Sequence, residues 1–194
     1  SVETADGTAV TEASTPVETE ALTVAQTFND QFRAWAASDG ADEMAAGAEE
    51  DRAFRAESGL EWHPYELELD CSLYQTEELI SVQAEYYSYT GGAHPNTVLL
   101  AWNYDLTTGQ FLTPEQLAAD GQAFSEAVRA ELLRQSQETA ADNDMAPEEY
   151  FWSNYEEILA GWSSYAVAFD ETGMTVGVSP FELAAYAAGP QIYH

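Results

Sequence analysis

The sequence contains no lysine, a single cysteine and no long apolar run. Its 194 residues carry five arginines against 35 acidic residues, which gives a formal net charge of −30 at pH 7. Binding to a nucleic-acid backbone needs clustered lysine and arginine, so this composition excludes that class of function. It also disfavours an anionic membrane surface. A cationic partner, a neutral ligand or a divalent cation stays open, as does the simpler interpretation of a self-repelling surface that keeps the protein soluble.

The lone cysteine, Cys71, leaves no partner for an intrachain disulfide. No apolar run approaches the ~18–20 residues of a membrane span. The sequence begins at Ser1 without an initiator methionine or a signal peptide. We therefore expect a fragment or mature form from which an upstream segment has been removed.

Residues 1–20 lack aromatic residues, leucine and isoleucine, and consist almost wholly of Ser, Thr, Ala, Val, Glu and Asp. Such a segment buries too little apolar area to offset its ordering entropy, so we predict a flexible acidic stalk. The remainder, 21–194, is predicted to form one domain, with an N-terminal half at about 21–90 and a C-terminal half at about 91–194. Its 45% apolar and 12% aromatic content suffices for a core.

Helical spacing is clearest at 21–38, where Val24, Phe28, Phe32 and Trp35 form one apolar stripe. The Ala- and Glu-rich stretch 41–57 is predicted to be a second helix. Alternation over 65–74 predicts a half-buried antiparallel strand, with Leu67, Leu69, Cys71 and Leu73 on the apolar side. Cys71 is accordingly predicted to be a small buried hydrophobe and not a nucleophile.

Two further strands, 79–89 and 97–106, are rich in β-branched and aromatic residues and flank the loop TGGAHPN at 90–96. A short strand is expected around Phe111. Thr113-Pro114-Glu115-Gln116 predicts a helix start with a capping box, and Asp120-Gly121 a break. A helix with Phe124, Val128, Leu132 and Leu133 on one side is expected to run to about Gln137 and to precede a polar loop at 139–144.

A further helix is predicted from Pro147, with an apolar stripe formed by Phe151, Tyr155, Ile158, Leu159 and Trp162. Residues 165–169 and 174–178 flank the turn DETG and predict a hairpin. The chain closes with a short apolar helix or extended segment that ends at Gly189-Pro190. Blocks of helices and antiparallel strands predict the α+β class, an antiparallel sheet of about five or more strands packed against helices.

No motif identifies a catalytic or metal centre. His63, His94 and His194 lack the spacing of a metal site. Asp142, Asn143, Asp144, Glu148 and Glu149 form an oxygen-rich cluster without an EF-hand pattern, so a solvated loop is favoured over weak calcium binding. Paired carboxylates are unavoidable among 35 acids, and no phosphate loop, dinucleotide fingerprint or nucleophile elbow occurs. We therefore expect no enzyme activity, no cofactor and no metal.

The loop between the two aromatic strands is the most individual feature. Gly91 and Gly92 permit positive φ angles, and Pro95 biases His94 toward an extended conformation. One interpretation is a shaped turn, and the other is a recognition loop. In the second interpretation the partner-binding residues are Tyr87, Tyr89, Gly91, Gly92, His94 and Asn96.

The run EYYSYTGGAHPNTVLLAWNYDLTTGQFLTPEQL (85–117) resembles the signature of the RsiV-type extracellular domain family, and SPFELAAYAAGP (179–190) resembles its C-terminal signature. The resemblance covers about 20–194 and implies an α+β module outside the bacterial membrane. Members occur in an anti-sigma factor whose extracellular part binds lysozyme, beside a polysaccharide deacetylase domain in PdaC-like proteins, and in lipoproteins.

The resemblance implies an extracellular binding or sensor module on the bacterial surface, tethered through an N-terminal anchor outside this sequence. Lysozyme or another cationic protein of the cell wall is the expected partner, and we expect a monomer. The alternative is a peptidoglycan- or glycan-binding lipoprotein module, for which Trp62, Trp102, Trp152 and Trp162 are candidates. A wall hydrolase that uses two carboxylates is a third hypothesis.

Overall fold

The computed structural model describes residues 26–34 and 41–194. The predicted stalk at 1–20 lies outside the described residues, as do Val24 and Trp35 of the first predicted stripe. Residues 26–34 are helical, as the stripe predicts. Among the described residues, no helix has the length and apolar character needed to cross a membrane.

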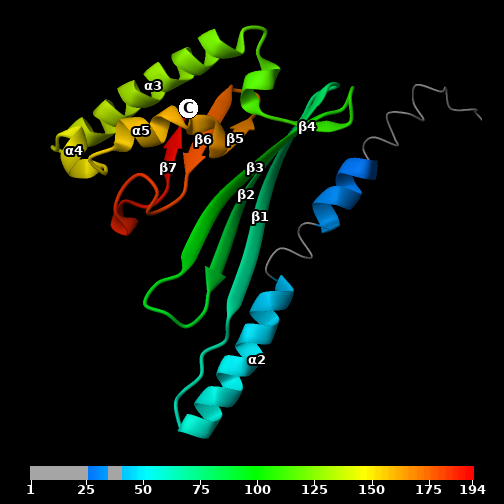
Figure 1. Cartoon of the computed structure of the whole chain (residues 1–194), viewed down its shortest axis with the longest axis vertical. Coiled ribbons are helices and arrows are strands. Elements are labelled where there is room, and N and C mark those ends of the chain that lie inside the picture. Colours follow the sequence, from blue (N-terminus) through cyan, green and yellow to red (C-terminus); the bar gives the residue numbers. More distant parts are fainter. Residues whose placement is uncertain (1–25, 35–40) are drawn as a thin grey trace, which may run out of the picture.

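The strands of a four-stranded antiparallel sheet run roughly along the long axis of the molecule (Figure 1). Its order is β1 (Glu66–Gln75), β2 (Leu79–Tyr89), β3 (Asn96–Asp105) and β4 (Gln110–Leu112). The β3–β4 turn is closed by the Asp105 carboxylate, which accepts hydrogen bonds from the Thr107 and Thr108 amides and from the Thr108 hydroxyl. The Thr108 hydroxyl bond is the main reason that the pKa of Asp105 lies below its usual value.

A second, three-stranded antiparallel sheet contains β5 (Ala166–Phe169), β6 (Met174–Val178) and β7 (Gln191–Tyr193), in that order. Helices α3 (Gly121–Asp142), α4 (Pro147–Tyr150) and α5 (Tyr155–Ala160) lie together beside this sheet (Figure 1). Short 3-10 turns complete the chain at Pro114–Leu117, Trp162–Ser164 and Tyr186–Ala188. The main core forms between these helices and the small sheet from Val128, Leu132, Leu159, Trp162, Val167, Val176, Val178 and Leu183.

The open edge of the small sheet meets one face of the large sheet through a buried polar pair. Ser81 donates its hydroxyl to Asn103 Oδ1 (2.8 Å), and Asn103 Nδ2 donates to the Val167 carbonyl (2.9 Å). The Phe169 amide in turn donates to Ser81 Oγ (2.8 Å). Side chains of β2 and β3 thus satisfy backbone groups of β5 that lack a neighbouring strand, as buried backbone polar groups require.

The helical segment 26–34 covers the part of the opposite face that β2 and β3 form. Phe28 is 3% exposed and packs against Tyr104, with ring centroids 5.1 Å apart. Phe32 meets Trp102 edge to face at 5.3 Å. Burying one such phenylalanine contributes about 2–3 kcal/mol, so this small cluster holds the N-terminal helix on the sheet.

The predicted burial of β1 is wrong, although the strand itself is confirmed. Leu73 is 61% exposed, Leu69 is exposed, and Cys71 is an exposed free thiol. The helical segment 26–34 packs against Ile80, Val82 and Tyr104, which belong to β2 and β3. Strand β1 lies at the border of the sheet, beyond the reach of this helical segment. Its alternating apolar side chains therefore stay exposed.

Several helix boundaries also differ from the predictions. The predicted break at Asp120-Gly121 is confirmed, since Asp120 caps α3 by accepting the Ala123 amide. Helix α3 does not end at about Gln137, however, and continues into the predicted loop at 139–144 as far as Asp142. The predicted helix after Pro147 is interrupted at Phe151, which forms a β-bridge with Ala184. Helix α2 (Ala41–Ser58) is confirmed but contains no buried residue.

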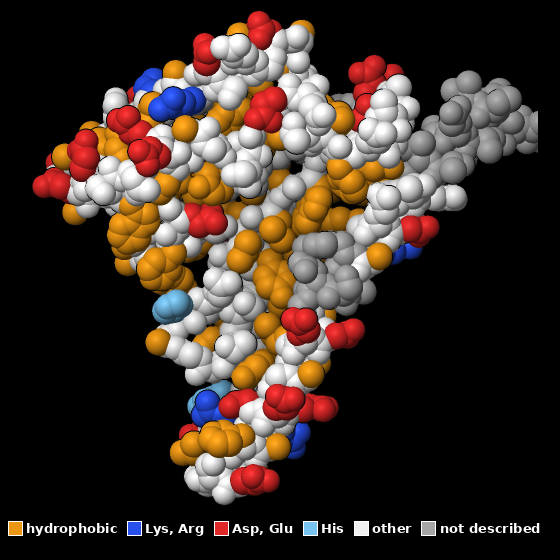
Figure 2. All heavy atoms as spheres, in the orientation of Figure 1, with side chains coloured by type: hydrophobic (Ala, Val, Ile, Leu, Met, Phe, Trp, Pro, Cys, Tyr) orange, Lys and Arg blue, Asp and Glu red, His pale blue; other side chains and the backbone are white. Residues whose placement is uncertain are grey.

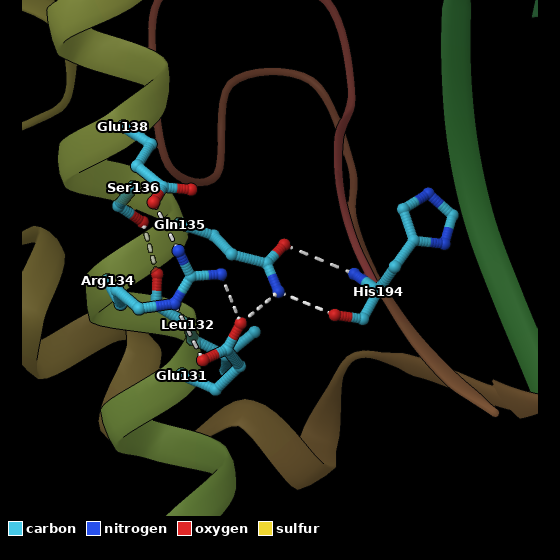
Figure 3. Close-up of polar contacts among 7 residues, drawn as sticks. All are labelled: Glu131, Leu132, Arg134, Gln135, Ser136, Glu138 and His194. Atoms are coloured by element: carbon cyan, nitrogen blue, oxygen red, sulfur yellow. Dashed lines mark hydrogen bonds and ion pairs between the residues drawn. The ribbon is translucent and has the colours of Figure 1, made fainter.

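The end of the small sheet is fastened to α3 by a side-chain amide (Figure 3). Gln135 Nε2 donates to the His194 carbonyl, and Gln135 Oε1 accepts the His194 amide. Arg134, the next residue in α3, forms ion pairs with Glu131 and Glu138, so its charge is neutralised within that helix. The α+β class, with antiparallel strands packed against helices, is confirmed, and the strands are divided between two sheets.

Candidate binding site

The loop between β2 and β3 has the shaped backbone that its glycines predict. Gly91 has φ +78°, a conformation that favours glycine. His94 is exposed, and its Nδ1 lies 2.9 Å from the Pro95 carbonyl oxygen. Because a carbonyl oxygen only accepts, Nδ1 is the donor in this contact.

The C-terminal segment 179–189 folds back onto this loop. Ser179 Oγ accepts the amide of Leu99 in β3, which fastens the start of the segment to the large sheet. Phe181 has φ +74°, which is strained for a bulky residue. Its carbonyl accepts a hydrogen bond from Trp152 Nε1 (2.9 Å), and its ring is left 55% exposed.

The two segments meet in an exposed aromatic cluster, which we define as His94, Phe181 and Tyr186. The His94 ring stacks on Tyr186 with centroids 4.2 Å apart and planes at 28°. The Tyr186 hydroxyl donates to the Pro95 carbonyl (3.0 Å). Phe181 lies 5.6 Å from Tyr186 and 6.2 Å from His94. Residues about 90 positions apart in sequence thus form one surface.

An acidic face lies on the neighbouring strands, which we define as Glu66, Glu68, Asp70 and Glu85. The register of β1 and β2 pairs Glu66 with Tyr89, Glu68 with Tyr87 and Asp70 with Glu85. Directly opposed residues of an antiparallel pair project from the same face, so these side chains share one surface. The pKa of Tyr87 is raised by partial desolvation, then by Glu66 and Glu68, with smaller effects from Tyr186 and Tyr89. Tyr87 therefore lies in the acidic face and within electrostatic range of Tyr186 in the aromatic cluster.

None of the arginines in the described part of the chain forms an ion pair with the acidic face. Arg55 pairs with Asp51, and Arg52 lies over the Trp62 ring. Asp70 and Glu85 oppose each other across the strands, and like charges so placed are destabilising. The described residues therefore leave the negative charge of this face unpaired, so the face is suited to a positively charged partner.

A groove of about 320 Å³ adjoins the acidic face between the two sheets. Asp70, Glu85 and Gln83 line one side, while Leu99, Pro190 and Ile192 supply an apolar wall. A lysine or arginine side chain has both an aliphatic stem and a charged head, so it matches such a lining.

The predicted site residues are only partly brought together. His94, Gly91 and Gly92 lie in the loop, and Tyr87 and Tyr89 project from the acidic face. Asn96 pairs with Ser88, so it projects from the opposite face. Tyr186 and Phe181 were missed, although the aromatic segment 179–190 was a signal for both.

Of the tryptophans considered for glycan binding, Trp162 is 1% exposed and belongs to the core, whereas Trp152 is exposed. In the described part of the chain, no group of three or more His, Cys, Asp or Glu side chains is arranged to hold a metal ion.

Comparison with known proteins supports the fold and a distant family resemblance. The model of the family described as "Deacetylase PdaC" matches residues 6–97, somewhat less than half of the chain. The chain is similar to the PdaC family in this region. The match includes β1, β2 and the loop with His94, so it covers one of the two segments that form the aromatic cluster. No curated protein matches the sequence.

Two solved structures of the DUF3298 family are similar to the chain. A member from Bacteroides fragilis is 20% identical with a TM-score of 0.55, covering 84% of this chain and 64% of its own. A protein from Pseudomonas aeruginosa is 19% identical with a TM-score of 0.48, covering 68% of this chain and 59% of its own. At this identity the first likeness indicates a common fold, and the chain spans about two thirds or less of these proteins.

Proposed function

We propose that this chain is an extracytoplasmic binding module that recognises a cationic protein of the cell wall environment, with lysozyme as the concrete candidate. The observation that carries the proposal is the aromatic cluster next to the acidic face, with which no described arginine forms an ion pair. Aromatic side chains serve as anchors in protein interfaces, and complementary charge raises the rate of encounter. The resemblance to the RsiV-type family supplies the identity of the candidate partner.

The test is titration calorimetry against a cationic lysozyme at low and at physiological salt. A specific complex retains one-to-one stoichiometry at physiological salt, because contacts inside an interface are screened less than surface charges. Heat that vanishes as the salt concentration rises would reduce the interaction to attraction by a charge of −30 and overturn the proposal.

The double substitution His94→Ala with Tyr89→Ala is expected to weaken binding about tenfold or more, since it removes anchors from the proposed surface. Circular dichroism is expected to show an unchanged fold. The matched control is His63→Ala with Phe54→Ala, which removes an exposed histidine and an exposed aromatic ring elsewhere. Equal loss of affinity in both double variants would contradict this location of the site.

Recognition of a wall glycan is the second candidate, favoured by the exposed ring of Phe181 in the cluster and by the exposed ring of Trp152, which donates to the Phe181 carbonyl. Saturable quenching of tryptophan fluorescence by peptidoglycan fragments, lost in Trp152→Phe, would support it. This result together with a negative lysozyme titration would replace the first proposal.

A further inference from the structure

Within the described part of the chain, strand β1 is a border strand with one open side. It pairs with β2 over all ten of its residues and stands first in the order of the sheet. Among residues 26–34 and 41–194, no backbone hydrogen bond joins its other side to another segment. Eight of its ten residues are exposed, so both faces of this strand are accessible. An open strand edge of this length is a template for pairing with another chain.

The two faces of β1 differ in chemistry. Glu66, Glu68 and Asp70 project to the acidic face, whereas Leu69, Cys71 and Leu73 alternate with them and project to the other. Figure 2 shows hydrophobic side chains gathered along the large sheet, between α2 and the helices α3, α4 and α5. An added strand would therefore meet carboxylates on one face and apolar groups on the other.

Charge decides which occupant fits this edge. A second copy would bring another chain of net charge −30 against the carboxylates, and an acidic or neutral strand would leave those carboxylates unpaired. A strand with basic residues at every second position would place them opposite Glu66, Glu68 and Asp70. The basic residue nearest Asp70 would also approach Glu85 and the groove lined by Leu99, Pro190 and Ile192.

We propose that the open edge of β1 takes up an extended segment of a cationic partner as a fifth strand, in which lysine or arginine alternates with apolar residues. The proposal deepens the proposed function, because it specifies how the partner binds while keeping its positive charge. Backbone pairing supplies affinity in this mode of recognition, and the alternate side chains supply selectivity. The aromatic cluster then contacts parts of the partner beyond the strand.

The test uses the whole chain and a ten-residue peptide of alternating lysine and valine with blocked ends. A second peptide of the same sequence carries N-methyl groups on every second amide, which removes backbone donors without changing the charge. Titration at physiological salt is expected to give binding of the first peptide and at least about tenfold weaker binding of the second. Hydrogen exchange at the β1 amides is expected to slow about tenfold or more with the first peptide.

Glu66→Gln with Glu68→Gln is expected to reduce peptide affinity about tenfold. The matched control is Glu126→Gln in α3 with Glu157→Gln in α5, which changes the net charge by the same amount. It is expected to leave the affinity within about twofold. Equal binding of both peptides, or an equal effect of both double variants, would mean attraction by net charge and overturn the proposal. Absence of peptide binding, or a dimer of the free chain by sedimentation, would overturn it as well.

The outcomes separate the two proposals. A lysozyme complex that survives physiological salt, without protection of β1, would retain the proposed function and reject the added strand. Peptide binding with β1 protection, and no lysozyme complex, would retain the added strand and reject lysozyme as the partner.

Discussion

At the scale of single residues, the candidate site depends on a few polar contacts that hold aromatic rings at the surface. Phe181 keeps a strained φ of +74° while its carbonyl accepts Trp152 Nε1. Tyr186 is held by its bond to the Pro95 carbonyl and stacks on His94. Ordering these rings before a partner arrives reduces the entropy cost of binding.

Asn103→Ala is expected to destabilise the fold by about 2–3 kcal/mol, because it leaves the Val167 carbonyl and the Ser81 hydroxyl without their buried partner. Urea unfolding followed by circular dichroism measures this loss. Thr97→Ala, on the same strand and face, is the control and is expected to change stability by no more than about 0.5 kcal/mol. Equal stability of both variants would show that the sheets are held together without this pair.

Tyr193 makes stability sensitive to high pH. Burial raises its pKa from 10.0 to about 12, although its contact with Ser136 acts in the opposite direction. As the pH rises, Tyr193 therefore loses its proton in the unfolded chain before it does so in the folded protein. Its contribution to the free energy of unfolding is fully present below pH 10 and is lost as the pH rises toward 12. The loss is about 2 kcal/mol. In chemical unfolding between pH 9 and 12, Tyr193→Phe is expected to lose less stability than the parent; parallel curves would contradict this.

At the scale of elements, local signals predicted most helices and strands because they depend on neighbouring residues. The range of β2 is the predicted one, and the Thr113 amide donates to Gln116 Oε1 as half of the predicted capping box. The predicted helix after Pro147 was wrong where a distant segment intervened. There the Trp152 amide donates to the Leu183 carbonyl, and the bridge between Phe151 and Ala184 interrupts the helix.

The exposure of β1 is tested by its cysteine. Native Cys71 is expected to react with a maleimide without denaturant, at a rate within about tenfold of the unfolded chain. Partial burial, followed by the charge of Asp70, raises the pKa of the thiol, so the rate is expected to increase as the pH rises above 8. Cys71→Ser provides the blank. Reaction in denaturant alone would restore the prediction of a buried cysteine.

At the scale of the whole molecule, a charge of −30 acts beyond any single contact. It favours encounter with cationic proteins and opposes association between copies, and both effects weaken as salt shortens the screening length. This is why the lysozyme titration is compared at two salt concentrations. Only contacts held within the aromatic cluster and along the acidic face are expected to persist.

The candidate site was predictable in its parts and not in its assembly. The loop with His94 was recognisable because glycine and proline restrict the backbone locally. The stacking of His94 on Tyr186, and the opposition of Asp70 to Glu85, depend on contacts between distant segments and on strand register. Asn96, predicted beside Tyr87 and Tyr89, projects from the opposite face because of that register.

By itself, the sequence determined the acidity, the absence of a disulfide within these 194 residues, most helices and strands, and the α+β class. These depend on residue type and short-range spacing. Tertiary structure alone decided which faces are buried, because burial depends on what covers a face and not on its pattern. The alternation around Cys71 correctly predicts a strand, yet Phe28 covers only the neighbouring strands. The same contacts expose β1 and join residues about 90 positions apart into one candidate surface.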